Sequence, residues 1–182
     1  AAARLDKAVA DELAPLKLDA ARLRTAIDAT EPGPAGRDRV AFEVSTNPGA
    51  PFGPLTKIAS GGELSRFILA LKVALAEAGG ATTMIFDEID RGVGGAVASA
   101  IGERLHRLAA ESQVLVVTHS PQVAARGNQH FLIAKSNDGT ITRTGVAALD
   151  PADRREEIAR MLSGAAITDE ARAQAGKLLE AA

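Results

Sequence analysis

The sequence predicts an α/β fold in which helices flank a mostly parallel sheet, with an antiparallel hairpin near the N-terminus. Two short apolar runs, 83–86 and 114–117, indicate buried strands, and a helical pattern lies between them. Strand, helix and strand in this order predict a parallel pair with a helical crossover. Alternating apolar residues on both sides of a Gly- and Pro-rich loop at 31–36 predict the hairpin.

The spacing of apolar residues predicts the N-terminal elements. Leucine or valine at 5, 9, 13 and 16 forms one stripe of a short helix, which Pro15 should end or distort. The two hairpin strands are expected at 23–27 and 40–44, where apolar residues alternate with polar or small ones. The stretch 47–54 is rich in Gly and Pro, and we expect a loop there.

The later elements follow from the same criteria. An apolar face at 64–75 predicts a helix that Gly79 and Gly80 stop. Asp150 followed by Pro151, and Thr168 followed by two acidic residues, are typical helix starts. A further helix is expected at 97–108, and two strands are expected at 131–133 and 141–146 around a turn at 137–140.

Composition excludes several classes of protein. The 182 residues include no cysteine, so disulfides and thiolate metal sites are excluded. A formal net charge of -2 and only 3% aromatic residues do not favour a nucleic-acid surface built on bulk charge or base stacking. No apolar run approaches the roughly 20 residues that span a bilayer, so the sequence predicts no contact with a membrane.

Ser60, Gly61, Gly62 and Glu63 precede the first strong helix, and two interpretations are open. In the first, Ser60 and Glu63 form a capping box that satisfies backbone N–H groups at the helix start. In the second, the two glycines let a phosphate approach the backbone, where the N–H groups and the helix dipole attract an anion.

Asp87 and Glu88 directly follow the first buried strand, at the sheet edge where ligands of parallel sheets bind. They are either solvated carboxylates or a pair with separate tasks. In the second case Asp87 holds Mg²⁺ through water, and Glu88 orients and deprotonates an attacking water molecule. His119 follows the second buried strand in the same way, as a structural residue or as a hydrogen-bond donor to a terminal phosphate.

A glycine-rich helix start, a strand ending in Asp-Glu and a strand ending in His, in this order, resemble the signature, Walker B and switch-histidine motifs of ATP-binding-cassette ATPases. The chain contains no Gly-x-x-x-x-Gly-Lys-Ser/Thr phosphate loop. This combination is similar to the structural-maintenance-of-chromosomes (SMC) family, whose heads are assembled from the two ends of the chain. Longer runs resemble the RecN branch of this family, which acts in bacterial double-strand-break repair; they lie at 47–49, 54–55, 57–66, 69–72, 85–90, 92–95, 117–125 and 159–164.

The resemblance implies the C-terminal lobe of an SMC-type ATPase head, with 1–16 as the end of a coiled-coil arm and 17–182 as the lobe. ATP and Mg²⁺ are the implied cofactors. The implied partners are the protein's own N-terminal Walker A lobe, a second head in a homodimer, and DNA, in the bacterial cytoplasm at the nucleoid. The fragment alone is expected to be inactive.

The resemblance also assigns the site residues. Ser60, Gly61, Gly62 and Glu63 would bind ATP held by the opposite head, while Asp87, Glu88 and His119 would act on the nucleotide of their own head. One departure from the family pattern is the Gly-Val-Gly-Gly sequence at 92–95, where SMC proteins carry an Asp.

Two alternatives stay open: a degenerate half-head that docks a partner without turnover, and the head of another SMC-like ATPase. Glu88 argues against the first, because a degenerate site would tolerate loss of the base. The missing phosphate loop, the glycines at 92–95 and the RecN-like runs argue against a transporter nucleotide-binding subunit. Arg154 and Arg155 are interpreted as a solvated helix face, with DNA contact as the alternative.

Overall fold

The computed structural model describes residues 1–34, 36–57, 61–76, 82–137, 142–164 and 166–181 of the chain. The chain divides into two compact units, Ala1–Val117 and Thr118–Ala182, and each is described by itself. Among the described residues, no helix is long and apolar enough to cross a membrane.

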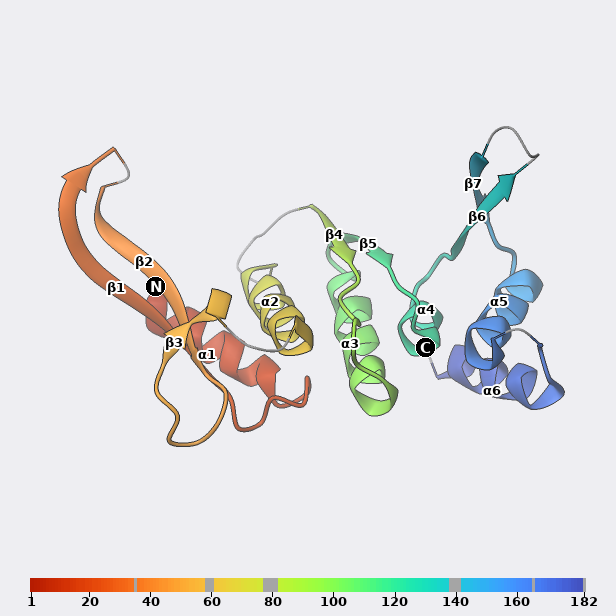
Figure 1. Ribbon diagram of the computed structural model, residues 1–182, viewed down its shortest axis with the longest axis horizontal. Coiled ribbons are helices and arrows are strands. Elements are labelled where there is room, and N and C mark those ends of the chain that lie inside the picture. Colours follow the sequence, from red (N-terminus) through yellow and green to blue (C-terminus); the bar gives the residue numbers. More distant parts are fainter. Residues whose placement is uncertain (35, 58–60, 77–81, 138–141, 165, 182) are drawn as a thin grey trace. The chain divides into compact units, whose positions relative to one another are not determined.

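The first unit opens with helix α1 (Ala2–Leu13) and an antiparallel sheet of β1 (Arg22–Gly33), β2 (Gly36–Ser45) and β3 (Gly53–Pro54). The long β1–β2 hairpin extends away from the helices of its unit (Figure 1). Leu23 pairs with Val44 and Ile27 with Val40, so one face of the hairpin is apolar. An ion pair joins Arg24 to Glu43 on the other face.

The second half of this unit is a strand–helix–strand arrangement that follows helix α2 (Gly61–Ala76). Strand β4 (Thr83–Asp87) and strand β5 (Gln113–Val117) pair in parallel, and helix α3 (Gly95–Leu108) connects them. Met84 and Phe86 are buried on one face of this pair, whereas Ile85 lies on the other face and is exposed. The alternation follows from the two-residue period of a strand.

The core of the first unit lies among α1, α2 and α3. Its fully buried side chains include Val9 and Leu16, Phe67 and Leu69 of α2, and Ile101 of α3. This burial explains the leucine and valine stripe at the start of the sequence.

A buried ion pair also ties α1 to α3 within this unit. Glu12 Oε2 lies 2.6 Å from Arg104 Nε, and each side chain is only 12% exposed. The pair therefore joins the helix that opens the unit to the helix that connects β4 and β5.

The second unit contains a short helix α4 (Pro121–Ala125), a hairpin of β6 (Phe131–Asn137) and β7 (Thr142–Ala148), and helices α5 (Pro151–Ser163) and α6 (Asp169–Glu180). The Asp150 side chain accepts hydrogen bonds from the N–H groups of Ala152 and Asp153, and Thr168 Oγ1 accepts one from Ala171. Both predicted helix caps are therefore confirmed. The unit's core is small and lies between α4, α5 and α6; its buried residues are Ala125, Ile158, Ala159, Ala171 and Ala175.

The α/β prediction is correct, but the expectation of a mostly parallel sheet is wrong for the described residues. Only β4 and β5 pair in parallel; β1–β2–β3 and β6–β7 are antiparallel. The physical reason is the length of the connections: among the strands that pair, β4 and β5 are joined through helix α3, whereas the antiparallel pairs are joined by short loops. The predicted stop at 79–80 and most of the predicted turn at 137–140 lie outside the described residues.

Candidate functional site

The first candidate element is the N-terminus of α2. Ser60 lies outside the described residues, and the helix begins at Gly61. As far as the structure describes the surroundings of Gly61, a Cβ atom there would meet nothing within 4 Å, which leaves room for a ligand to approach the backbone. Glu63 lies in the first turn and is half-buried. The N-terminus of a helix can bind an anion through its backbone N–H groups and its dipole. The capping-box interpretation stays open because it depends on Ser60.

Sequence reasoning gave no role to Arg66, one turn further along α2. Its guanidinium Nε donates to the Gly62 carbonyl at 3.1 Å. Its Nη1 donates to the carbonyls of Leu16 at 2.9 Å and Lys17 at 3.1 Å, in the turn after α1. These acceptors lie about fifty positions away in the sequence, so no local pattern could have revealed the contact.

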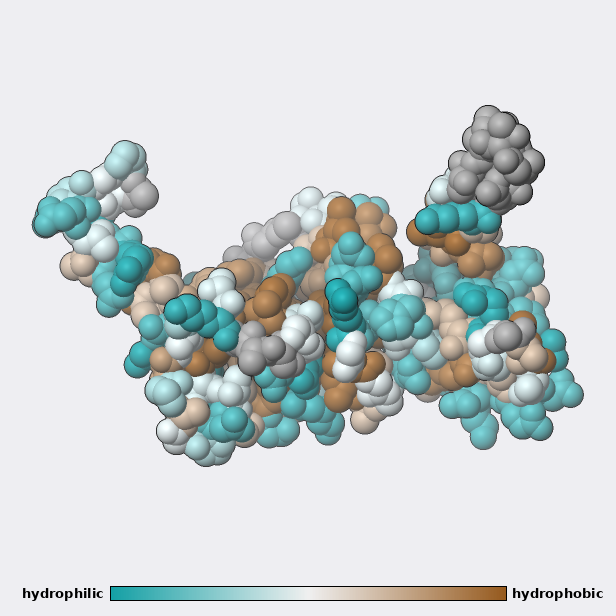
Figure 2. Space-filling view, in the orientation of Figure 1, coloured by the Kyte–Doolittle hydropathy of each residue, from teal (hydrophilic) through white to brown (hydrophobic). Residues whose placement is uncertain are grey.

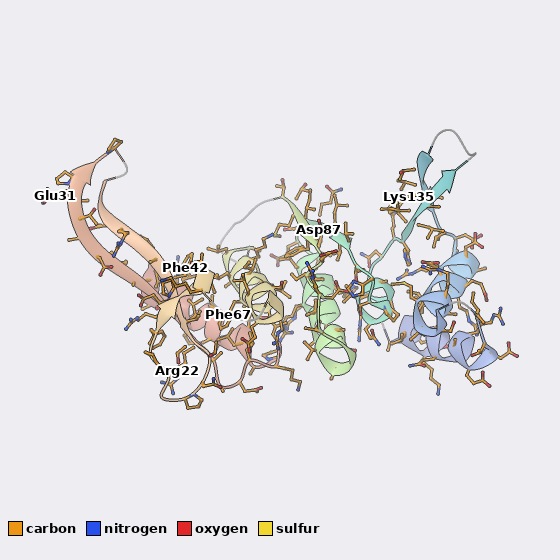
Figure 3. The ribbon with its side chains drawn as sticks, in the orientation of Figure 1. Arg22, Glu31, Phe42, Phe67, Asp87 and Lys135 are labelled. Atoms are coloured by element: carbon orange, nitrogen blue, oxygen red, sulfur yellow. The ribbon has the colours of Figure 1, made fainter. Side chains whose placement is uncertain are left out.

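Asp87 and Glu88 lie together at the carboxyl end of β4, as predicted. Figure 3 labels Asp87 at this position. Asp87 is the last residue of the strand, is exposed, and pairs with Val117 of β5. The Glu88 N–H donates to the Val117 carbonyl at 3.2 Å, which fixes Glu88 at the same edge. Its side chain is 60% exposed and forms an ion pair of 3.5 Å with Arg91. Both carboxylates are therefore accessible to a ligand.

The backbone of Glu88 adopts φ +48°, in the left-handed region. This conformation costs roughly 1–2 kcal/mol for a residue other than glycine. Such strain occurs preferentially at active sites and ligand clamps. The strained residue is the one that the sequence selects as the catalytic base.

The described residues contain no group of three or more His, Asp or Glu side chains that could hold a metal by themselves. Asp87 fits the role expected of it, because protein-bound Mg²⁺ usually keeps several of its water molecules, and an exposed carboxylate can accept hydrogen bonds from them.

The segment after Glu88 contains a residue that sequence reasoning did not single out. Asp90 is fully buried, and its carbonyl accepts a hydrogen bond from the Val93 N–H at 3.2 Å. Gly92 and Gly95 have φ of +72° and +52°, which explains the glycines of this loop, because other residues are strained there. The one hint of this burial in the sequence is that Asp90 directly follows the apolar residue Ile89, which is itself buried.

His119 lies in the second unit, two residues after β5, and its side chain is exposed. The neighbouring Thr118 Oγ1 accepts a hydrogen bond from the Ser120 N–H at 3.0 Å, which shapes the turn into α4. Because the two units are described separately, the predicted position of His119 beside Asp87 and Glu88 stays a prediction.

The chain is similar in sequence to known DNA repair proteins. No protein-family model matches the chain. The DNA repair protein RecN of Streptomyces coelicolor is 46% identical over 195 residues, which cover 100% of this chain and 34% of the relative. RecN of Xylella fastidiosa (strain 9a5c) is 51% identical over 149 residues, which cover 82% of this chain and 27% of the relative. The chain is a homologue of RecN. It spans about a third of the length of the RecN proteins that it matches.

Solved structures of SMC heads have a similar fold. A structure from work on ATP-driven dimerisation and DNA-stimulated activation of SMC ATPases matches with a TM-score of 0.62 at 18% identity, covering 90% of this chain and 94% of the other. The Smc head domain of Pyrococcus yayanosii, solved with a coiled coil and joint, gives a TM-score of 0.65 at 21% identity and covers 86% of this chain and 28% of the other. The RecN homologue thus has the α/β fold of an SMC head.

Arg154 of this RecN homologue is not part of a solvated face. Its Nη2 donates to the carbonyls of Ala124, Ala125 and Gly127 at the end of α4. The side chain therefore satisfies carbonyls that a helix end leaves without intrahelical partners. Arg155 is exposed, as the sequence suggests.

His130, which received no function from the sequence, is half-buried near Arg154. Burial lowers the pKa of His130 below its ordinary value of 6.5, and the positive charge of Arg154 lowers it further. The negative charge of Glu157 acts in the opposite direction. The neutral imidazole is therefore favoured in the folded protein.

Proposed function

We propose that this chain is the C-terminal lobe of an SMC-type ATPase head in a RecN-like DNA repair protein. An N-terminal lobe that carries the Walker A phosphate loop completes the head. The single observation that carries this proposal is the incomplete parallel sheet. Ile85 is 62% exposed, Leu115 47% and Val117 50%, all in the β4–β5 pair. Parallel sheets are normally covered on both faces.

Apolar surface over β4 and β5 is visible in Figure 2. The pair has only two described strands, which is too few for an independently stable parallel sheet. Further strands and a covering layer from an N-terminal lobe would bury this face. The chain spans 34% of the Streptomyces coelicolor RecN, which leaves room for such a lobe.

The motif residues then divide between two nucleotides. Ser60, Gly61, Gly62 and Glu63 form the signature end of α2 and bind the terminal phosphate of ATP held by a second head. The open backbone at Gly61 supports this, because a phosphate must come within hydrogen-bond distance of N–H groups.

Asp87, Glu88 and His119 serve the nucleotide of their own head. Mg²⁺, held by Asp87 through water, would neutralise charge on the transferred phosphoryl group. Glu88 accepts a proton from the attacking water, whose oxygen forms the new bond to the γ-phosphorus as the bond to ADP breaks. His119 donates a hydrogen bond to the terminal phosphate oxygens. ATP thereby joins two heads in a homodimer, and hydrolysis separates them.

The DNA repair role comes from the names of the RecN relatives, and DNA is the partner on which the heads are proposed to act. A cytoplasmic place at the bacterial nucleoid follows from that role. The residues 1–16 would be the end of a coiled-coil arm that leads into the lobe, although α1 already packs in the core of the first unit.

The test is Glu88→Gln in complete heads, which keeps size and hydrogen bonding but removes the base. Hydrolysis should fall by about 10²-fold or more, the scale of a lost general base. ATP binding should persist, and ATP-bound dimers should accumulate. Asp87→Asn, the matched change at the neighbouring carboxylate, should weaken Mg²⁺-dependent binding as well as the rate.

Single-turnover hydrolysis and dimer lifetime measure both effects. If wild-type complete heads show no turnover, the alternative of a half-head that only docks a partner is favoured. If Glu88→Gln heads hydrolyse ATP at the wild-type rate, Glu88 is not the base.

A further inference from the structure

The two glycines that begin α2 make an intrinsically weak helix start. Glycine costs about 1 kcal/mol relative to alanine in a helix interior, because its backbone loses more conformational freedom, and the same entropy favours fraying at a helix end. Among the described residues, no atom outside its own chain neighbours and helix backbone lies within 4 Å of the Cβ position of Gly61. A binding turn of this kind needs another group to fix it, since a frayed turn does not present its N–H groups in one direction.

Two side chains of α2 donate to carbonyls of this turn: Ser65 Oγ donates to the Gly61 carbonyl at 3.0 Å, and Arg66 also reaches a second segment of the chain. Its Nε donates to the Gly62 carbonyl, and its Nη1 donates to the carbonyls of Leu16 and Lys17. One planar guanidinium therefore bridges the first turn of α2 and the turn after α1. Because the donors of a guanidinium form a rigid fork, the two backbone segments are held in a fixed relation.

The turn after α1 is a firm anchor for Arg66. The Leu18 N–H donates to the Leu13 carbonyl and the Lys17 N–H to the Ala14 carbonyl, both at 2.9 Å. Lys17 adopts φ +58°, the left-handed conformation that closes such a helix end. Leu16 is fully buried and Leu18 nearly so, which fixes the turn in the core.

The positive charge of Arg66 is stabilised near the start of α2 by the carbonyl groups that follow α1. A positive charge near the N-terminus of α2 opposes the dipole of that helix. The carbonyls that follow α1 carry the opposite partial charge and stabilise the guanidinium. An anion bound at Gly61 and Gly62 would interact favourably with both the dipole of α2 and Arg66.

We propose that Arg66 is a positioning residue for the signature turn: it holds Gly61 and Gly62 in the conformation that receives the terminal phosphate, and it anchors that turn to the end of α1. This inference rests on the proposed function, since it assumes that the turn binds ATP held by a second head. Arg66 does not itself contact the nucleotide.

The experiment uses the full-length protein and compares Arg66→Ala with Arg66→Lys. A lysine at this position retains the charge but loses the fork, so it should be intermediate. Three quantities are measured: ATP affinity of the single head, ATP-driven head association, and hydrogen exchange without nucleotide at residues 65–68, whose N–H groups bond to the carbonyls of the first turn of α2. The proposal expects Arg66→Ala to weaken association by about tenfold or more, the scale of lost charged hydrogen bonds, and to speed exchange. The affinity of a single head for ATP should stay within about twofold of the wild-type value, because the N-terminal Walker A lobe of that same head holds the nucleotide.

Arg154→Ala is the matched control. Arg154 also donates to three backbone carbonyls at a helix end, but it belongs to the second unit, and its acceptors are Ala124, Ala125 and Gly127 rather than residues of α2. Its loss should lower the melting temperature to a similar degree and leave ATP-driven association near the wild-type level.

The outcomes distinguish failure of the proposed role of Arg66 from failure of the proposed function. If Arg66→Ala associates as well as wild type, or if Arg154→Ala weakens association equally, Arg66 has only a structural role and the inference is wrong. If the wild-type protein itself fails to associate with ATP, the proposed function fails first, and that result is visible without any Arg66 variant.

Discussion

The buried ion pair between Glu12 and Arg104 allows a prediction whose magnitude follows from the structure. The two side chains are each 12% exposed, and their nearest charged atoms are 2.6 Å apart. Removing one partner from such a pair leaves an uncompensated buried charge and costs about 3–5 kcal/mol. The exposure is small but not zero, so Arg104→Met should lower the free energy of unfolding by about 3 kcal/mol, at the low end of this range.

The stability loss should largely disappear when both charges are replaced. Glu12→Leu combined with Arg104→Met substitutes apolar side chains of similar volume, and such replacements are often neutral or stabilising. The double variant should therefore lie within about 1 kcal/mol of the wild type, whereas the sum of the single changes would be far larger.

Urea unfolding of the wild type, the two single variants and the double variant measures these free energies. The m-value should be unchanged across the four proteins, which shows that the midpoints report stability. A loss below about 0.5 kcal/mol for Arg104→Met is the scale of an ordinary surface change and would refute the reasoning. It would mean that water reaches the pair despite its burial.

Further predictions concern the nucleotide site and the second unit. The chain alone should not release phosphate from ATP, because the Lys and backbone cradle of a phosphate loop are absent from its sequence; substantial turnover by the purified chain would contradict the split head. Ser60→Arg should block ATP-driven dimerisation of complete heads by filling the phosphate pocket, and sizing chromatography checks this, while normal dimerisation would favour the capping interpretation. Because the folded protein lowers the pKa of His130 below 6.5, the unfolded chain binds its proton more readily, and stability should fall as the pH drops below about 6.5. His130→Gln should remove that part of the pH dependence in urea unfolding at pH 7.5 and pH 5.5; an unchanged dependence would show that other groups cause it.

Local chemistry made much of the fold predictable. The helix starts at Asp150 and Thr168 were correct because an N-cap depends on residues only two or three positions away. The parallel pair of β4 and β5 was predictable because both strands are apolar and a helical period separates them. The placement of Asp87 and Glu88 at one sheet edge followed directly from that topology.

Contacts between distant segments were not predictable from the sequence. Arg66 donates to the carbonyls of Leu16 and Lys17 because α1 and α2 pack together. The apolar pattern of one helix does not indicate which other helix it packs against. The left-handed backbone of Glu88 was also hidden, since glutamate gives no local signal for that conformation. Both hairpins were predicted from their short turns, but the expectation of a mostly parallel sheet needed more than the one parallel pair, β4 and β5, that the described residues contain.

The uncovered apolar face of β4 and β5 has a consequence for the biogenesis of the protein. A newly made lobe with such a face can associate with other nascent chains before its intended cover arrives, and a parallel pair forms slowly because its contacts are non-local. Overexpression of this chain alone is therefore expected to yield inclusion bodies or chaperone-bound material. Supplying the completing lobe in the same cell would hide the face as soon as the strands form, so the soluble yield becomes a direct measure of how well the two halves fit.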